Sequence, residues 1–208
     1  MPNHVYTSAT IFGPAEALDA IVAIAENDED KSILEHFLPL PAEALTESTF
    51  GGQTITVFAE GGYSTAVDLW GSKWADYEVE LVDDDRTDAL PSVTLRFQSA
   101  WNPVVEGYRK LSTLLGISAV LDYEDEGGCF LGASTVANGE VIFEEWYSGE
   151  EAEKKPLFTE NVPAEPEDSS SDEWQEWYEA YNEAWNELRV ACSDNAFAAL
   201  PTGDKVTA

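Results

Sequence analysis

The chain has 208 residues, of which 44% are hydrophobic, and its 41 acidic and 10 basic side chains give a formal net charge of -31. That length supports one domain with an extension, and the apolar content is sufficient for a core. The charge opposes direct binding to nucleic acid or to an anionic membrane, because both normally require clustered Lys and Arg.

The N-terminal third predicts a β-α unit followed by an insertion. Residues 4–13 are rich in β-branched and aromatic side chains and predict a strand, and residues 14–26 predict a helix. The segment 33–45 is broken by two prolines, so we expect an extended, packed loop and then a short helical turn. A short strand within 51–62 and a helix that ends at Gly71 follow.

The middle of the chain completes a ferredoxin-like pattern. Residues 75–85 and 93–100 predict a hairpin, 102–116 a helix with Asn102 as N-cap, and 117–126 a further strand. A second hairpin over 129–147 turns at Asn138-Gly139. We therefore expect an α+β domain over 1–149, with the order β-α-β-β-α-β, an antiparallel sheet, helices on one face, an insertion at about 33–62 and an added hairpin.

The C-terminal part changes character after residue 149. Residues 150–171 predict an acidic linker or arm, 172–193 an amphipathic helix with a capping box from Ser170 to Glu173, and 194–208 a frayed tail. The helix has an aromatic stripe at heptad-like spacing, made of Trp174, Tyr178, Tyr181, Trp185 and Leu188. This stripe either docks on the protein's own domain or forms a dimer or partner interface.

Several short motifs resemble one family. "FLPLPAEAL", "LWGSKWADYEVEL", "VTLRFQSAWNPVVEGYRKLS" and "ISAVLDYEDEGGCFLG" occur in that order within about residues 3–132. They resemble the YubB-type ferredoxin-like domain family of phage and plasmid accessory proteins. The residues that carry the resemblance are Trp70, Gly71, Lys73, Trp74, Ala100, Trp101, Pro103, Tyr123, Glu124 and Gly127. The resemblance implies a ferredoxin-like fold and an origin in a mobile element, and it implies no established activity.

The Trp-rich motif has a structural and a binding interpretation. Trp70 and Trp74 are four residues apart, Gly71 lets the chain turn from helix into sheet, and Trp101 lies at the end of a strand. Lys73 is expected over a Trp face or beside a carboxylate. Core packing is the first interpretation, and a ligand cradle built from these rings is the second.

The sequence predicts no catalytic centre and no cofactor. The only cysteines are Cys129 and Cys192, and no zinc, P-loop or nucleophile-elbow motif is present. The acidic runs Asp83–Asp85 and Glu124–Glu126 are oxygen-rich enough for Mg²⁺ or Ca²⁺, but such runs are more often solvated loops. The N-terminus has no signal-peptide pattern and no stretch resembles a membrane span, so we expect a cytoplasmic protein.

Charge and the family resemblance together suggest a function. We expect a non-enzymatic protein that binds and inhibits a host nucleic-acid-handling or defence protein with a basic surface, with carboxylates standing in for phosphates. The expected partner-binding side chains are exposed acids on two strand ends and on the C-terminal helix. They are Asp83, Asp84, Asp85, Glu124, Asp125, Glu126, Glu173, Glu176, Glu179, Glu183 and Glu187.

Two other interpretations explain the charge without mimicry. It can keep the surface solvated, or it can adapt the protein to high salt. In the alternative function, the protein is a structural module that forms a homodimer through the aromatic helix.

Overall fold

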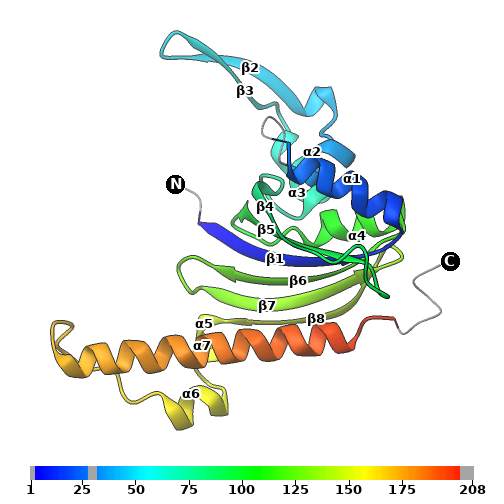
Figure 1. Cartoon of the computed structure of the whole chain (residues 1–208). Helices are drawn as coiled ribbons and strands as arrows, with labels where there is room; N and C mark the ends of the chain where they lie inside the picture. Colours follow the sequence, from blue (N-terminus) through cyan, green and yellow to red (C-terminus); the bar gives the residue numbers. More distant parts are fainter. Residues whose placement is uncertain (1–2, 28–31, 202–208) are drawn as a thin grey trace.

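The computed structural model describes residues 3–27 and 32–201. Its main feature is a six-stranded antiparallel sheet in the order β4-β5-β1-β6-β7-β8, and a separate two-stranded ribbon is formed by β2 and β3 (Figure 1). The strands are β1 (His4–Phe12), β2 (Leu45–Phe50), β3 (Gln53–Phe58), β4 (Tyr77–Asp84), β5 (Ser92–Ala100), β6 (Ser118–Asp125), β7 (Phe130–Ala137) and β8 (Glu140–Ser148). The helices are α1 (Ala15–Ala25), α2 (Ile33–Phe37), the 3-10 turn η1 (Ala42–Ala44), α3 (Gly62–Trp70), α4 (Val105–Leu115), α5 (Gly149–Ala152), α6 (Pro156–Asn161) and α7 (Asp172–Ala198).

The predicted ferredoxin-like α+β fold is confirmed. Strands β4, β5, β1 and β6 with helices α1 and α4 form the β-α-β-β-α-β unit, and β7 and β8 extend the sheet beyond β6. The register places Ala9 of β1 opposite Leu95 of β5 and Leu121 of β6, so alternate residues of three strands share one buried face.

The first face of the sheet carries the larger core. Side chains of α1 and α4 pack on it, and Tyr108 of α4 stacks on Phe97 of β5 with ring centroids 5.5 Å apart. Leu18, Leu95 and Leu121 are completely buried in this cluster. Burial of this apolar face stabilises the domain and fixes which residues point to the opposite face.

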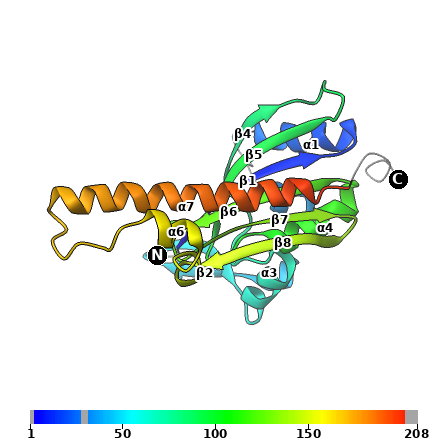
Figure 2. The same ribbon diagram turned by 90° about the horizontal axis from the view of Figure 1, so that it is seen from below.

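The second face of the sheet is only half covered. Helix α7 lies across β6, β7 and β8, and Trp185, Leu188 and Cys192 are buried there with Leu131 and Phe158 (Figure 2). Beside α7, no described helix covers the polar side chains of β4, β5 and β1 that line an open groove on this face, and only the end of β1 at Phe12 packs against Phe197 of α7.

Strands β2 and β3 form an arm that projects from the domain (Figure 1). The prediction for 33–45 was partly wrong, because Ile33–Phe37 is helical, capped by the Ser32 hydroxyl, which accepts from the Glu35 N–H at 3.0 Å. The predicted helical turn is η1. Strand β2 was not predicted, since all its side chains are exposed and it therefore lacks an alternating apolar pattern.

Two local predictions are confirmed and two caps are corrected. Gly71 ends α3 with φ 85°, and Asn138 and Gly139 form the predicted turn with φ of 52° and 81°. The N-cap of α4 is Val104 rather than Asn102. The N-cap of α7 is Ser171 rather than Ser170, and its hydroxyl accepts from the Trp174 N–H at 3.0 Å.

The C-terminal part is helical over much of its length. Residues 150–171 contain most of α5 and all of α6, and α7 continues to Ala198, five residues beyond the expected helix end at 193. Residues 202–208 of the expected tail lie outside the described residues. Within the described part of the chain, no helix has the length and apolar character needed to cross a membrane.

Candidate functional site

The acidic side chains of α7 lie on one side of the helix. At about 100° per residue, all seven fall within an arc of about 120°. All seven are exposed, and none forms an ion pair with another described residue. We call this surface the acidic face; it consists of Asp172, Glu173, Glu176, Glu179, Glu183, Glu187 and Asp194.

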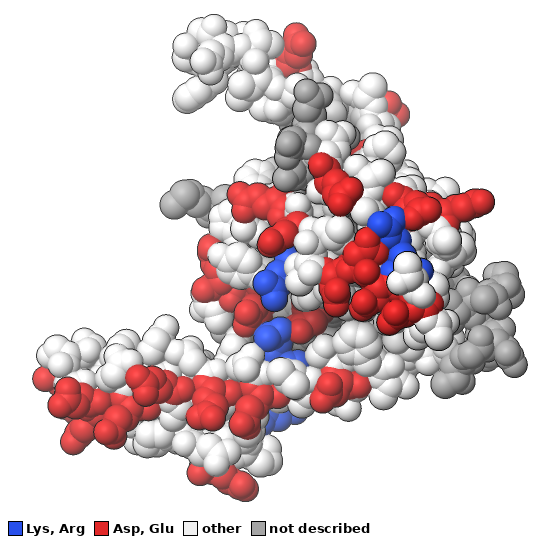
Figure 3. Space-filling view, in the orientation of Figure 1, with Lys and Arg blue, Asp and Glu red and all other residues white. Residues whose placement is uncertain are grey.

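The acidic face is continuous on the molecular surface. Figure 3 shows Asp and Glu side chains following one another along α7, with few Lys or Arg atoms beside them. The five helix residues expected from the sequence belong to this face, and the structure adds Asp172 and Asp194. The helix extends beyond the sheet at its N-terminal end, so the acids there project away from the domain (Figure 2).

The opposite side of α7 carries the aromatic stripe, whose two halves have different surroundings. Trp185 and Leu188 are buried against the sheet and α6, and Tyr181 lies 5.4 Å from the Phe158 ring. In the overhanging half, Trp174 stacks on Tyr178 at 5.1 Å, and Tyr178 is 44% exposed. One half therefore attaches α7 to the domain, and the other half presents aromatic surface to solvent.

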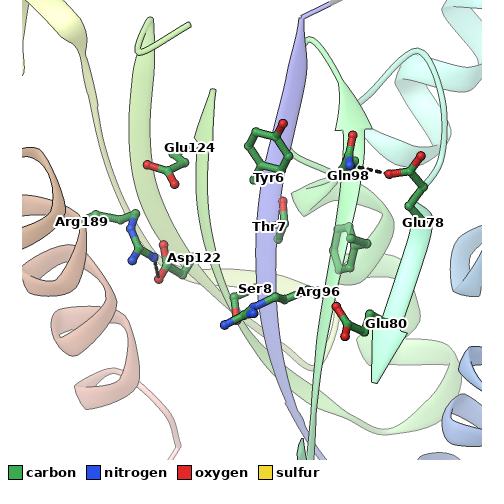
Figure 4. A pocket seen from close by; sticks show the side chains of 11 residues that line it. Tyr6, Thr7, Ser8, Glu78, Glu80, Arg96, Gln98, Asp122, Glu124 and Arg189 are labelled. Carbon is green, nitrogen blue, oxygen red and sulfur yellow. Dashed lines mark hydrogen bonds and ion pairs between the residues drawn. The ribbon is translucent and has the colours of Figure 1, made fainter. Parts of the chain in front are cut away.

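A polar groove lies between α7 and the uncovered half of the sheet (Figure 4). Its volume is about 510 Å³. The charged residues that line it are four carboxylates and two guanidiniums: Glu78, Glu80, Asp122, Glu124, Arg96 and Arg189. Tyr6, Ser8 and Gln98 add neutral polar groups, and Gln98 donates to Glu78 at 2.5 Å.

One wall of the groove is an ion pair between Arg189 of α7 and Asp122 of β6, with N···O at 2.6 Å. Burial raises the pKa of Asp122, and Arg189 opposes that shift. The Oδ1 atom of Asp122 is buried and has no hydrogen-bond partner among the residues that the structure describes. Only the other oxygen of this carboxylate, Oδ2, is paired with Arg189.

Arg96 lies in the other part of the groove, on β5. It is the cross-strand partner of Ser8 on β1 and of Glu80 on β4. It forms no ion pair with any described residue, although the chain is rich in carboxylates. Figure 4 shows its guanidinium reaching over β1 beside Ser8. The groove thus offers an unpaired guanidinium close to several acceptors.

From the sequence, Glu124 was expected in a binding surface, but the two guanidiniums of the groove were not. The available signals were weak: Arg96 interrupts an otherwise neutral strand, and Arg189 is the only basic side chain in α7. Their approach to one groove depends on the docking of α7, which the local sequence does not specify.

The two acidic strand ends lie at opposite ends of the sheet. Asp84 pairs with Val93, which pairs with Ile11, whereas Asp125 pairs with Val5. Six residues of β1 separate these rows, which is about 20 Å. The expected acids therefore do not form one cluster.

The acidic side chains at these two strand ends also differ in whether they are free to contact a partner. Arg86 pairs with Asp84 at 2.6 Å and with Asp19 at 2.5 Å, which partly neutralises the first end. At the second end, Asp125 is buried and accepts from the Gly127 and Cys129 N–H groups, so it shapes the turn. Glu126 is exposed there, and Asp83 and Asp85 are exposed at the first end.

The Trp motif lies where α3 meets the strand ends, and of its three rings only Trp70 is in the core, whereas Trp74 and Trp101 are 39% and 42% exposed. The buried indole of Trp70 donates to the Leu38 carbonyl at 2.9 Å, and a Cβ on Gly71 would lie 3.3 Å from the Pro103 oxygen. Lys73 Nζ lies 4.9 Å from the ring centroids of both Trp74 and Trp101. This cation-π arrangement confirms the prediction that Lys73 lies over a Trp face.

A hollow of about 770 Å³ lies beside this motif, at the root of the arm. It is lined by Trp70, Lys73, Trp74, Leu45 and Phe58, among others. Its lining combines apolar and aromatic side chains with Thr56, one carboxylate, Glu35, and one cation, Lys73.

Among residues 3–27 and 32–201, no group of three or more His, Cys, Asp or Glu side chains is placed to hold a metal ion. Cys129 is exposed, and hydrogen bonding to Asp125 raises the pKa of its thiol, which reduces the thiolate fraction.

Comparison with known proteins supports the fold assignment. Residues 76–173 match the family model described as the ferredoxin-like domain in Api92-like protein. The match supports a ferredoxin-like family, and the narrower resemblance to YubB-type phage and plasmid proteins stays a prediction.

A crystal structure of the protein api92 from Yersinia pseudotuberculosis is similar at 18% sequence identity, with a TM-score of 0.35. The similarity covers 41% of this chain and 30% of that protein's chain. A comparison with curated proteins found no match.

Proposed function

We propose that the protein is a non-enzymatic binding protein whose acidic face engages the basic surface of a nucleic-acid-handling protein. The observation that carries the proposal is the placement of all seven acids of α7 on one exposed side, without ion pairs to described residues. A charge array that forms no ion pair with the described residues is available to Lys and Arg of another protein.

The charge density of the acidic face indicates what it can imitate. From Asp172 to Asp194 the helix rises about 33 Å, which gives roughly one carboxylate per 5 Å. A single DNA strand carries about one charge per 3.4 Å, and the duplex about one per 1.7 Å. The acidic face is therefore nearer in density to one nucleic-acid strand than to a duplex, and it fits a groove that contacts a single backbone.

The polar groove provides a second type of contact. Its carboxylates add to the field of α7, and Arg96 can pair with an acidic side chain of the partner. Such mixed contacts set orientation, whereas the long acidic face accelerates the encounter. By occupying the partner's nucleic-acid groove, the protein would act as an inhibitor of a host defence or replication protein. The resemblance to phage and plasmid proteins supports this part of the proposal.

A second candidate is self-association through the overhanging half of α7. The observation that favours it is the exposed stack of Trp174 and Tyr178, since aromatic side chains are favoured interface anchors. In that case the charge serves solubility or salt adaptation. A complex of this kind persists in high salt, whereas a complex made by the acidic face dissociates.

The experiment that tests the proposal is capture from bacterial lysate on the immobilised protein at low salt, followed by elution with duplex or single-stranded DNA. The proposal expects a basic, nucleic-acid-handling protein that DNA releases. Retained proteins that salt releases but DNA does not would show that the protein does not act as a nucleic-acid mimic.

A further inference from the structure

The arm formed by β2 and β3 is the most exposed secondary structure in the domain. Every β2 side chain is exposed, and so are the first four of β3. Phe50 at the tip is 80% exposed and Ile55 is 44% exposed. Figure 1 shows the arm leading away from the sheet, with neither of its outer edges covered.

The arm is almost free of charge in a highly charged chain. Between residues 45 and 58 the only ionisable side chain is Glu47. The register divides the side chains into two faces, and the face that holds Thr46, Ser48, Phe50, Gln53, Ile55 and Val57 has no charge at all. This face combines β-branched, aromatic and small polar residues, which is the composition of a pairing strand.

The two free edges of the main sheet are protected in a different way. Edge strand β4 carries Glu78, Glu80, Asp83 and Asp84, and edge strand β8 carries Glu140, Glu144 and Glu145. Charged side chains on edge strands oppose pairing with another chain. The arm has no Lys, no Pro and no bulge, and its single charge is Glu47, so it has few of the features that prevent an edge strand from pairing with another chain.

A two-stranded ribbon is at best marginally stable in water, and three or more strands or packing against a helix are needed for independent stability. Most of the arm has neither a third strand nor a helix packed against it. If two such ribbons paired along their edges, they would form a four-stranded sheet. In each ribbon, the outward-facing backbone N–H and C=O groups of one strand would then be hydrogen-bonded to the other ribbon.

We propose that the arm is a dimerisation element and that its occupant is the arm of a second copy of this chain. Two chains of net charge -31 repel each other over most of their surfaces, and they meet at the lowest electrostatic cost where the charge is least. The arm holds this least charged surface away from the body. Two identical arms related by a two-fold axis present the same surface to each other, as a closed dimer requires. The proposal is independent of the partner proposed for the acidic face.

The test is the mass in solution, measured by sedimentation equilibrium up to a concentration on the order of 10⁻⁴ M, at low salt and in about 1 M NaCl. We expect a dimer that strengthens with salt, because screening reduces the repulsion between the bodies. The variant Ile55→Glu places a charge on the neutral face and is expected to raise the dimer Kd about tenfold or more. The matched control is Ile142→Glu, because Ile142 on β8 is 39% exposed and also lies on an edge strand.

Both substitutions are at exposed positions, and thermal unfolding checks that each variant is folded. Phe50→Glu at the tip of the arm is a second variant with the same expected effect. A wild-type chain that remains a monomer in both salt conditions overturns the proposal. So does a dimer that Ile55→Glu and Phe50→Glu leave intact, since the interface would then lie elsewhere.

Discussion

The indole N–H of Trp185 donates to Glu124 at 3.1 Å, and one turn further along α7, Arg189 pairs with Asp122 at 2.6 Å. Four residues of helix rise about 6 Å, and two residues of strand rise about 6.6 Å. The two contacts therefore match in spacing and align α7 antiparallel to β6. This pair of contacts fixes the rotation of the helix, and with it the direction in which the acidic face points.

Trp185→Ala is expected to destabilise the protein by about 3–5 kcal/mol, because it leaves a cavity between α7, α6 and the sheet. Trp185→Phe keeps an aromatic ring, so its free energy of unfolding is expected to fall by less. Equilibrium urea unfolding measures both. Tyr178→Ala in the overhanging half is the control, and it should change the stability by less than about 1 kcal/mol. Equal losses at the two positions would show that Trp185 does not attach α7 as described.

Arg189→Gln is expected to destabilise the protein more at pH 8 than at pH 5. Without Arg189, the largely buried Asp122 loses its counter-charge, so its folded-state pKa rises further above its unfolded value. A raised folded-state pKa contributes stability at low pH, and that contribution is lost as the pH rises through it. Urea unfolding at the two pH values measures the effect, and adding Asp122→Asn should remove its pH dependence. A loss that is the same at both pH values would contradict this account.

Asp76 predicts a second pH effect, in the first core. Its carboxylate accepts from the Ser32 hydroxyl at 2.7 Å and from the Leu34 N–H at 2.9 Å, and burial raises its pKa from 3.8 to about 6. The stability linked to this group is complete below about pH 4 and is lost as the pH rises through 6. The loss is roughly 2–3 kcal/mol.

Asp76→Asn isolates that effect, because Asn keeps an acceptor oxygen but does not titrate. The unfolding free energies of wild type and variant are compared from pH 4 to pH 8, so that the other carboxylates cancel. As the pH rises, the unfolding free energy of the variant should increase relative to that of the wild type. A difference that is constant over this range would mean that Asp76 is not held with a raised pKa.

The parts of the fold that depend on local chemistry could be predicted from the sequence. Gly71 and the Asn138-Gly139 turn need positive φ, and only a few residue types accept it. The alternation of Val93, Leu95 and Phe97 specified the buried face of β5. The spacing of Trp185 and Leu188 specified the docking side of α7.

The remaining features depend on contacts between distant residues. Strand β2 has no buried side, so its only signal is its pairing with β3. The groove needs Arg96 and Arg189, which are far apart in sequence and meet only because α7 covers half of the sheet. Asp125 was expected in a binding surface, but its carboxylate closes a turn, and nothing in the acidic run around it distinguishes that role.

We propose that the acidic face of α7 binds a basic partner, and this is tested by comparing capture by two variants with the same loss of charge. One variant has Gln at Glu173, Glu176, Glu179, Glu183 and Glu187, and the other has the corresponding amides at the exposed residues Glu26, Glu43, Glu60, Asp68 and Glu140. The proteins retained at low salt are quantified by mass spectrometry.

We expect the wild type and the second variant to retain the same protein that DNA releases, and the α7 variant to lose it. Equal retention by the two variants would show that binding follows the net charge and not the acidic face of α7.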